Sequence, residues 1–242
     1  MTLQPIDRDI WLVEGPVVSF YGLPYTTRAV IVRLPDGGLW VWSPVDLTQD
    51  LRLAVGALGT VTHLVSPNRL HHLWLADWAR VWPDATLWGP ASTQRKRADL
   101  TFAPALEDTA PTAWAGVIDQ VWLRASVLMD EVVFFHRPSG TAILGDYSEN
   151  FPESTLHAHW PAWARPIARL LRITEPYGYA PAELRWTTFR RSRARASVRR
   201  MLAWNPERVV MAHGTWQSCD GRRYLESAFA WVLGSGGDAR GD

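Results

Sequence analysis

Four residues that can bind a metal each follow a short apolar segment: the adjacent pair His71 and His72, then Asp146, then His213. An apolar run followed by a polar residue is the pattern of a buried strand that ends at a loop. Imidazole and carboxylate groups are ligands for Zn, Mn and Fe. If the ends of these strands converge, the four side chains can surround one divalent metal.

Each of these residues also has a purely structural interpretation. Two adjacent histidines at a helix N-terminus, taken alone, are more often one exposed and one packed side chain, and they lack the usual i, i+2 or i, i+4 ligand spacing. Asp146 is otherwise a turn residue or a helix N-cap, although Gly145 before it would let the carboxylate enter a cleft. His213 is otherwise a hydrogen-bonded histidine in a strand-to-loop turn. The metal hypothesis rests on the coincidence of all the sites.

The composition fits a globular protein with a sizeable core. The chain has 242 residues, of which 47% are hydrophobic and 20% charged. Its formal net charge of +1 predicts no general attraction to nucleic acid or to a membrane. The single Cys219 excludes an internal disulfide. The first residues lack the pattern of a signal peptide, so we expect a cytoplasmic protein.

The elements that must position these residues come in two groups of strands, each followed by helices. Strands are expected at 10–13, 17–21, 29–34, 39–43, 61–65 and 86–88, and then at 117–123, 131–135, 141–144 and 209–212. Helices are expected at 49–58 with Thr48 as N-cap, and at 70–82, 188–202 and 221–233. This order predicts an α/β protein, namely a four-layer αββα sandwich.

The domain organisation is expected to be simple. Residues 1–233 are predicted to form a single domain, in which the proline- and aromatic-rich segment 150–186 is an irregular or broken-helical insert near the cleft. The Gly-rich residues 234–242 are predicted to be a disordered tail. The arginine-rich segment 190–200 is interpreted as a solvated helix face. His136, at the far end of a hairpin from Asp146, is expected to be structural.

The chain resembles, over nearly its whole length, the DUF4336 group of the metallo-β-lactamase-like superfamily. The residues that carry the resemblance are Arg28–Leu34 with Gly38–Pro44, Val65–His72, Phe135–Thr141, Gly145 with Asp146, and Val210–Gly214. The resemblance implies a metallo-β-lactamase-like αββα fold.

The metal-binding signature of that superfamily, His-x-His-x-Asp-His, is altered in this sequence. Pro67 and Arg69 stand where the first two histidines belong, His71 replaces the aspartate, and His72 matches the last histidine. A further histidine is missing from the region held by Ser126–Met129. The resemblance therefore implies that the first metal position is lost. The second position maps onto His71, His72, Asp146 and His213, which implies one divalent metal, Zn first and Mn or Fe as alternatives.

The resemblance implies a mononuclear metal-dependent hydrolase of a small ester, thioester, lactam or phosphodiester. Asp146 would be a metal ligand or, if it does not ligate, a general base. Asn68 and Arg69 are expected at the vacated first position, where Arg69 could hold an anionic substrate group. A lid is expected from aromatic residues of the insert, namely Trp160, Trp163, Tyr177, Tyr179 and Trp186. Two alternatives remain: a non-enzymatic member that binds a ligand or partner, and a single-iron redox protein.

Overall fold

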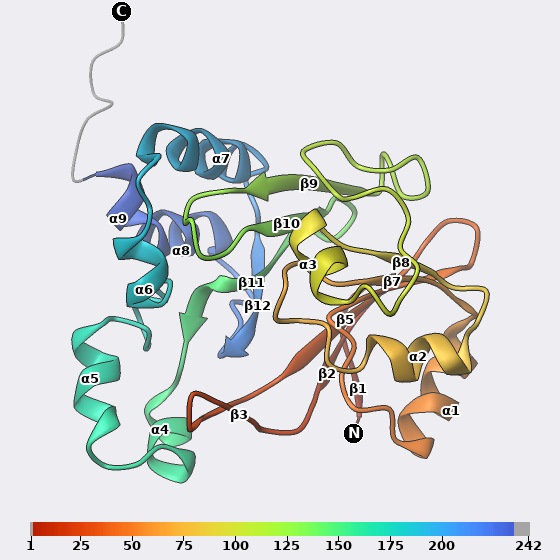
Figure 1. Cartoon of the computed structure of the whole chain (residues 1–242), viewed down its shortest axis with the longest axis horizontal. Helices are drawn as coiled ribbons and strands as arrows, with labels where there is room; N and C mark the ends of the chain where they lie inside the picture. The colour runs from red at the N-terminus through yellow and green to blue at the C-terminus, as the bar shows by residue number, and fades with distance from the viewer. Residues whose placement is uncertain (1, 235–242) are drawn as a thin grey trace, which may run out of the picture.

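The computed structural model describes residues 2–234, which form two large β-sheets and their covering helices (Figure 1). The larger sheet has the strand order β1 (Leu3–Asp7), β2 (Ile10–Glu14), β5 (Arg28–Arg33), β6 (Leu39–Trp42), β7 (Val61–Val65) and β8 (Thr86–Trp88). The smaller sheet has the order β12 (Arg208–Gly214), β11 (Thr141–Asn150), β10 (Glu131–His136) and β9 (Ile118–Leu123). A separate hairpin joins β3 (Val18–Phe20) to β4 (Leu23–Tyr25).

The two sheets pack face to face through a buried apolar layer. Trp40 and Trp42 of the larger sheet contribute to this layer together with Phe134 and Ile143 of the smaller sheet, and all four side chains are fully buried. Burial of large aromatic and branched side chains is the main stabilising contribution in such a layer, at about 1.5–3 kcal/mol per side chain.

Helices cover the outer face of each sheet. The outer face of the larger sheet packs against α1 (Gln49–Leu58) and α2 (Leu75–Val81). The outer face of the smaller sheet packs against α7 (Arg191–Ala203), α8 (Gly221–Ala228) and α9 (Ala230–Leu233). The two groups of helices lie on opposite sides of the molecule in Figure 1, so the predicted αββα sandwich is confirmed. No helix within residues 2–234 is long and apolar enough to cross a bilayer.

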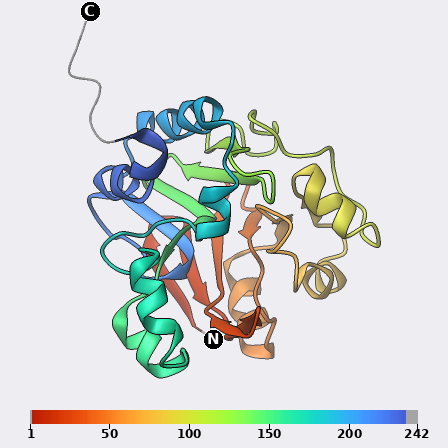
Figure 2. The same ribbon diagram turned by 60° about the vertical axis from the view of Figure 1, so that its left-hand side comes forward.

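The segment predicted to be an insert contains three short helices. These are α4 (Glu153–His159), α5 (Ala164–Leu170) and α6 (Ala182–Trp186). Its first part has a small core of its own, in which Phe151, Leu156 and Trp160 are buried. Figure 2 shows α4 and α5 grouped together at one end of the molecule, away from α3 (Ala91–Lys96).

Several element boundaries differ from the expected ones. The helix predicted from Leu70 begins only at Leu75, and residues 67–74 form bends and turns instead. The reason is local, because the Asn68 side chain accepts the backbone N–H of Leu70 at 2.8 Å and holds a turn where the helix was expected. The helix predicted at 221–233 is interrupted at Phe229. Within the predicted tail, residues 235–242 lie outside the described residues.

Candidate metal centre

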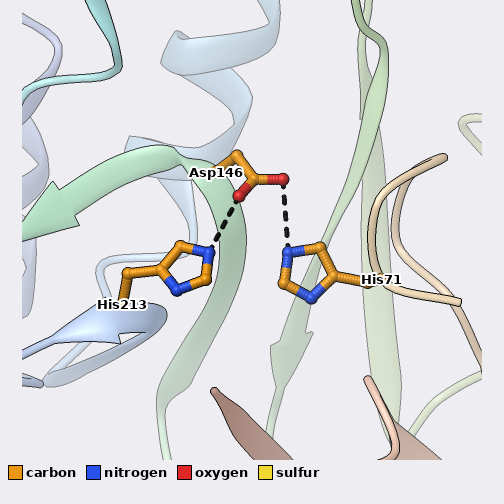
Figure 3. Close-up of side chains that lie close together, drawn as sticks. All are labelled: His71, Asp146 and His213. Atoms are coloured by element: carbon orange, nitrogen blue, oxygen red, sulfur yellow. Dashed lines mark hydrogen bonds and ion pairs between the residues drawn. The ribbon is translucent and has the colours of Figure 1, made fainter. Parts of the chain in front are cut away.

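His71, Asp146 and His213 lie together in the interior between the two sheets (Figure 3). Asp146 Oδ1 is 3.0 Å from His213 Nε2, and Asp146 Oδ2 is 3.2 Å from His71 Nε2. One ligand atom from each residue lies within 4.8 Å of the others, and among residues 2–234 this is the one such group of three metal-binding side chains. At most 9% of each of these side chains is exposed. Two imidazoles and one carboxylate form a donor set that fits a divalent transition metal.

The two strands that carry Asp146 and His213 run parallel, which brings both residues to the same end of the smaller sheet. β11 and β12 pair in register from Thr141 to Leu144, and the register then shifts before Glu149 pairs with His213. Asp146 lies in this irregular part of β11. Such a break in the ladder re-aims side chains and is common beside functional sites.

Each imidazole is held by a contact to Nδ1, the ring nitrogen that does not face Asp146. His213 Nδ1 lies 2.6 Å from the carbonyl oxygen of Thr26, so this nitrogen carries a proton and donates. His71 Nδ1 lies 2.7 Å from Ser43 Oγ, and Ser43 has a φ of 49° in the left-handed region at the end of β6. Contacts of this kind fix the ring orientation and the tautomer of metal-ligating histidines. They leave both Nε2 atoms facing the carboxylate.

Asp146 is itself supported by buried polar groups. Asn68 Nδ2 donates to Asp146 Oδ2 at 2.7 Å and to Glu131 Oε2 at 3.0 Å. The Glu131 carboxylate accepts the backbone N–H of Gly145 at 2.8 Å and that of Asp146 at 2.7 Å. A Cβ on residue 145 would lie 2.6 Å from Glu131 Oε2. Glycine is therefore required before the aspartate, because the supporting carboxylate approaches the backbone there.

The charges of this group are strongly coupled. Burial alone would raise the pKa of Asp146, but the nearby His71 and the hydrogen bonds from both histidines outweigh it and lower this pKa. Burial opposes protonation of His71, and Asp146 outweighs it, so the pKa of His71 is raised. Burial, followed by the charge of Asp146, raises the pKa of Glu131 to about 7. The metal-free site thus favours an ionised Asp146 that attracts a cation.

His72 lies outside the group, so the expectation of four side chains around one point is corrected to three. Its backbone carbonyl accepts a hydrogen bond from Arg97 at 3.0 Å, and its Nδ1 is 3.5 Å from the same guanidinium. Burial, then the charges of Lys96 and Arg97, lower the pKa of His72 to about 4. The sequence could not separate the two histidines, because consecutive residues of an irregular turn point in directions that no periodicity describes.

The three residues face a cleft of about 800 Å³. Its walls come from the β3–β4 hairpin, residues 69–74, α3, Leu128 with Met129, and the region of α6. Arg69 lies on the lining, whereas Asn68 is buried against Asp146.

The aromatic lid expected from the insert does not line this cleft. None of the five residues named for it contributes to the lining, and the aromatic side chains there are Phe20, Tyr21, Tyr25 and Trp74. Trp160 is instead buried, with its indole N–H donated to the carbonyl oxygen of Pro24 at 2.9 Å. Trp163 and Trp186 are exposed outside the cleft, so the expected lid is wrong.

Two acidic residues of the site were missed from the sequence. Glu131 opens an apolar strand, where it looks like an exposed strand end, yet it is fully buried. Glu149 lies in a polar stretch of β11, is 1% exposed, and lines the cleft; its Oε2 has no hydrogen-bond partner among the described residues. Burial, then the charge of Asp146, raises the pKa of Glu149 well above its usual value. In the sequence, the feature that could have identified Glu131 as a buried site residue is its position as a single acidic residue at the start of an apolar strand.

His136 lies at the other end of the β10–β11 hairpin, as predicted. It pairs with Thr141 in the ladder, and its Nδ1 is 2.7 Å from Ser139 Oγ. It is 1% exposed. The environment is that of a packed structural histidine.

The fold is that of solved metallo-β-lactamases. The DIM-1 metallo-β-lactamase is 14% identical, with a TM-score of 0.61 over 94% of this chain and 95% of that one. FIM-1 from Pseudomonas aeruginosa, solved in its mono-zinc form, is 11% identical, with a TM-score of 0.61 over 96% and 94%. The metallo-β-lactamase from Pontibacter korlensis is 11% identical, with a TM-score of 0.62 over 96% and 98%. Identities this low show the fold alone.

Family membership comes from the sequence. No curated protein matches the chain. The family described as "Domain of unknown function (DUF4336)" matches residues 8–162, which is more than half of the chain. These residues include the turn with His71 and the strand with Asp146, whereas His213 lies beyond them. The protein therefore belongs to the DUF4336 family and has a metallo-β-lactamase-like fold.

Proposed function

We propose that this protein is a mononuclear metal-dependent hydrolase that acts on a small-molecule ester, thioester, lactam or phosphodiester. The observation that carries the proposal is the convergence of His71, Asp146 and His213 beside a cleft. Zn is the first candidate metal, and Mn and Fe are the alternatives. When bound, such a metal supplies Lewis acidity, which polarises a carbonyl or phosphoryl oxygen and acidifies water.

The number of ligands supports a catalytic rather than a structural role. Structural zinc sites are closed by four protein ligands, whereas catalytic sites use three and keep one position for water or substrate. His72 is turned toward Arg97, so three protein ligands remain here. The two-histidine, one-carboxylate set is of the kind found in catalytic zinc sites.

Asp146 fits the role of metal ligand better than that of general base. Both of its oxygens are already held, one by His213 and the other by His71 and Asn68. Despite burial, the neighbouring histidines lower its pKa, which makes it a weak proton acceptor near neutral pH. Its negative charge would instead compensate the charge of a buried dication.

Glu149 is the residue best placed to exchange a proton with a substrate. Its carboxyl group lines the cleft, and Oε2 makes no hydrogen bond among the described residues. Tyr25, which acts against the effect of burial on the pKa of Glu149, packs edge-on against His213, with ring centroids 5.0 Å apart. Because burial raises its pKa, Glu149 can hold a proton near neutral pH and release it to a leaving group.

The names of the structural neighbours agree with this proposal. They are metallo-β-lactamases, and one of them was solved with a single zinc. This agreement is at the level of the fold, because the sequences share few residues. It supports a metal-dependent hydrolase without naming the substrate.

The test is hydrolysis by protein stripped with a chelator and reloaded with one equivalent of Zn²⁺, Mn²⁺ or Fe²⁺. The substrates are 4-nitrophenyl acetate, a thioester, a β-lactam and bis(4-nitrophenyl) phosphate. We expect metal-dependent turnover of at least one of them. Asp146→Ala should abolish it, and His159→Ala, which changes an exposed histidine outside the cleft, should not. Equal rates for wild type and Asp146→Ala, or no turnover with any metal, would overturn the proposal.

A further inference from the structure

Three cationic side chains line the same cleft as the candidate metal centre. Arg69 precedes His71 by two residues, and Arg95 and Lys96 form the last turn of α3. All three are exposed at the mouth of the cleft. Segments far apart in the chain thus place three positive charges on one wall.

None of these cations is neutralised by an acidic side chain in the part of the chain that the structure describes. Within residues 2–234, Arg69, Arg95 and Lys96 form no ion pair with an acidic side chain, although the chain holds 24 acidic residues. The next residue, Arg97, behaves differently, because it is bound to Asp99 at 2.7 Å. The three cations that line the cleft are thus unpaired among the described residues, whereas Arg97, which does not line it, is paired.

The cations also act on one another. Partial burial, followed by the charge of Arg69, lowers the pKa of Lys96. Electrostatic repulsion between the positive charges of Arg69 and Lys96 raises the energy of the free protein. An anion bound between them would relieve this repulsion. Guanidinium and ammonium groups together suit a phosphate or carboxylate group, which accepts several charge-assisted hydrogen bonds.

The lining also carries the other sign of charge. Glu183 of α6 lines the cleft and is exposed, and Figure 1 shows α6 apart from α3, which carries Arg95 and Lys96. An anionic group would be repelled from this side and attracted to the cationic one. The cleft is therefore polarised, which would give a charged substrate one orientation relative to His71, Asp146 and His213.

We propose that Arg69, Arg95 and Lys96 form a subsite for the oxyanion group, phosphate or carboxylate, of an anionic substrate. This inference rests on the proposed function, because it assigns the class of molecule that the metal centre would hydrolyse. The ester, thioester or phosphodiester would carry a negative group several bonds from the reacting atom. A neutral substrate of the same shape would bind more weakly.

The test is calorimetric titration of metal-free protein with three probes that share one ring: phenyl phosphate, benzoate and benzyl alcohol. Metal-free protein is used because a phosphate or carboxylate can also bind directly to a metal. We compare wild type with the triple variant Arg69→Gln, Arg95→Gln, Lys96→Gln. The matched control is Arg52→Gln, Arg191→Gln, Arg193→Gln, which removes the same charge from exposed positions outside the cleft.

We expect wild type and the control to bind at least one of the two anions more tightly than benzyl alcohol. The triple variant should lose about tenfold or more in affinity for that anion. A preference for phenyl phosphate would identify a phosphorylated substrate, and a preference for benzoate a carboxylate. Equal binding of the alcohol and both anions, or unchanged affinity in the triple variant, would overturn the subsite.

The metal content of the reloaded protein separates this inference from the proposed function. Bound anion in a protein that takes up no metal would leave the subsite standing and refute the hydrolase. A protein that takes up metal but binds benzyl alcohol as tightly as both anions would refute the subsite and leave the hydrolase standing. Thermal melts of each variant check that the substitutions, which are all at exposed positions, leave the fold intact.

Discussion

The carboxylate of Glu131 accepts the backbone N–H of Asp146 at 2.7 Å, so one buried acidic residue holds the backbone of another. The same carboxylate accepts the N–H of Gly145 and the amide of Asn68. Glu131→Ala should therefore leave the backbone N–H groups of Gly145 and Asp146 without an acceptor and Asn68 with one acceptor instead of two. The cost is about 1–3 kcal/mol for each unsatisfied group. We expect a loss of several kcal/mol in the free energy of unfolding, measured by urea denaturation of the metal-free protein.

Glu107→Ala is the control for this loss, because Glu107 is exposed and makes no side-chain hydrogen bond or ion pair among the described residues. It should change the free energy of unfolding by less than about 0.5 kcal/mol. If both variants unfold at the same urea concentration, Glu131 does not support the backbone of Asp146.

His71 and His72 should differ in their effect on metal binding, although they are neighbours in the chain. His71→Ala removes one of the three converging imidazole and carboxylate ligands. His72→Ala removes a side chain that faces Arg97. We expect the affinity for Zn²⁺, measured by competition with a chromogenic chelator, to fall at least about a hundredfold for the first variant and by less than about threefold for the second. The opposite order would show that the turn at 68–74 presents the other histidine.

Stability should fall on acidification through His136. Burial lowers the pKa of this residue to about 4 in the folded protein from 6.5. Between these values the unfolded chain binds a proton that the folded protein does not, so the contribution is present above pH 6.5 and is lost as the pH falls toward 4. It amounts to about 3 kcal/mol at most.

Urea denaturation of metal-free wild type and His136→Gln at pH 7, 5.5 and 4.5 measures this contribution. The wild type should lose more stability over this range than the variant, because other titrating groups are common to both. Parallel losses would mean that His136 accepts a proton without unfolding.

Glu149→Gln should separate turnover from metal binding. The amide keeps the size of the side chain but can neither release nor accept the proton that we assign to this residue. With a substrate found in the hydrolysis screen, kcat should fall by about 10²–10⁴-fold, while the zinc content stays at the wild-type level. A variant with wild-type kcat would exclude Glu149 from proton transfer.

Most strands could be predicted because they are apolar runs bounded by turn residues. Val61–Val65 and Val209–Ala212 are examples: the first ends before the turn that carries His71, and the second directly precedes His213. Parallel neighbours in a sheet bring such ends to one edge, so the strand pattern favoured a convergence of His213 and Asp146 that the sequence itself does not show. The two-layer grouping of strands likewise predicted the αββα order of layers.

Other features depend on contacts that no local pattern contains. All ten residues of β11 are buried, so its polar half, Asp146–Asn150, shows no alternation of buried and exposed side chains and was not expected to be a strand. The turn held by Asn68 replaces a helix whose apolar spacing continues through it. The burial of Glu131 depends on the N–H groups of another strand.

The central claim is that Asp146, with His71 and His213, holds one metal ion. The most direct measurement is elemental analysis of untagged protein purified without chelator, for wild type, Asp146→Ala and His136→Ala. Asp146 is the only carboxylate of the group, so its removal leaves a dication without a charge-compensating ligand. We predict about one equivalent of metal in wild type and His136→Ala, and almost none in Asp146→Ala. Two equivalents in wild type, or full metal content in Asp146→Ala, would contradict the account.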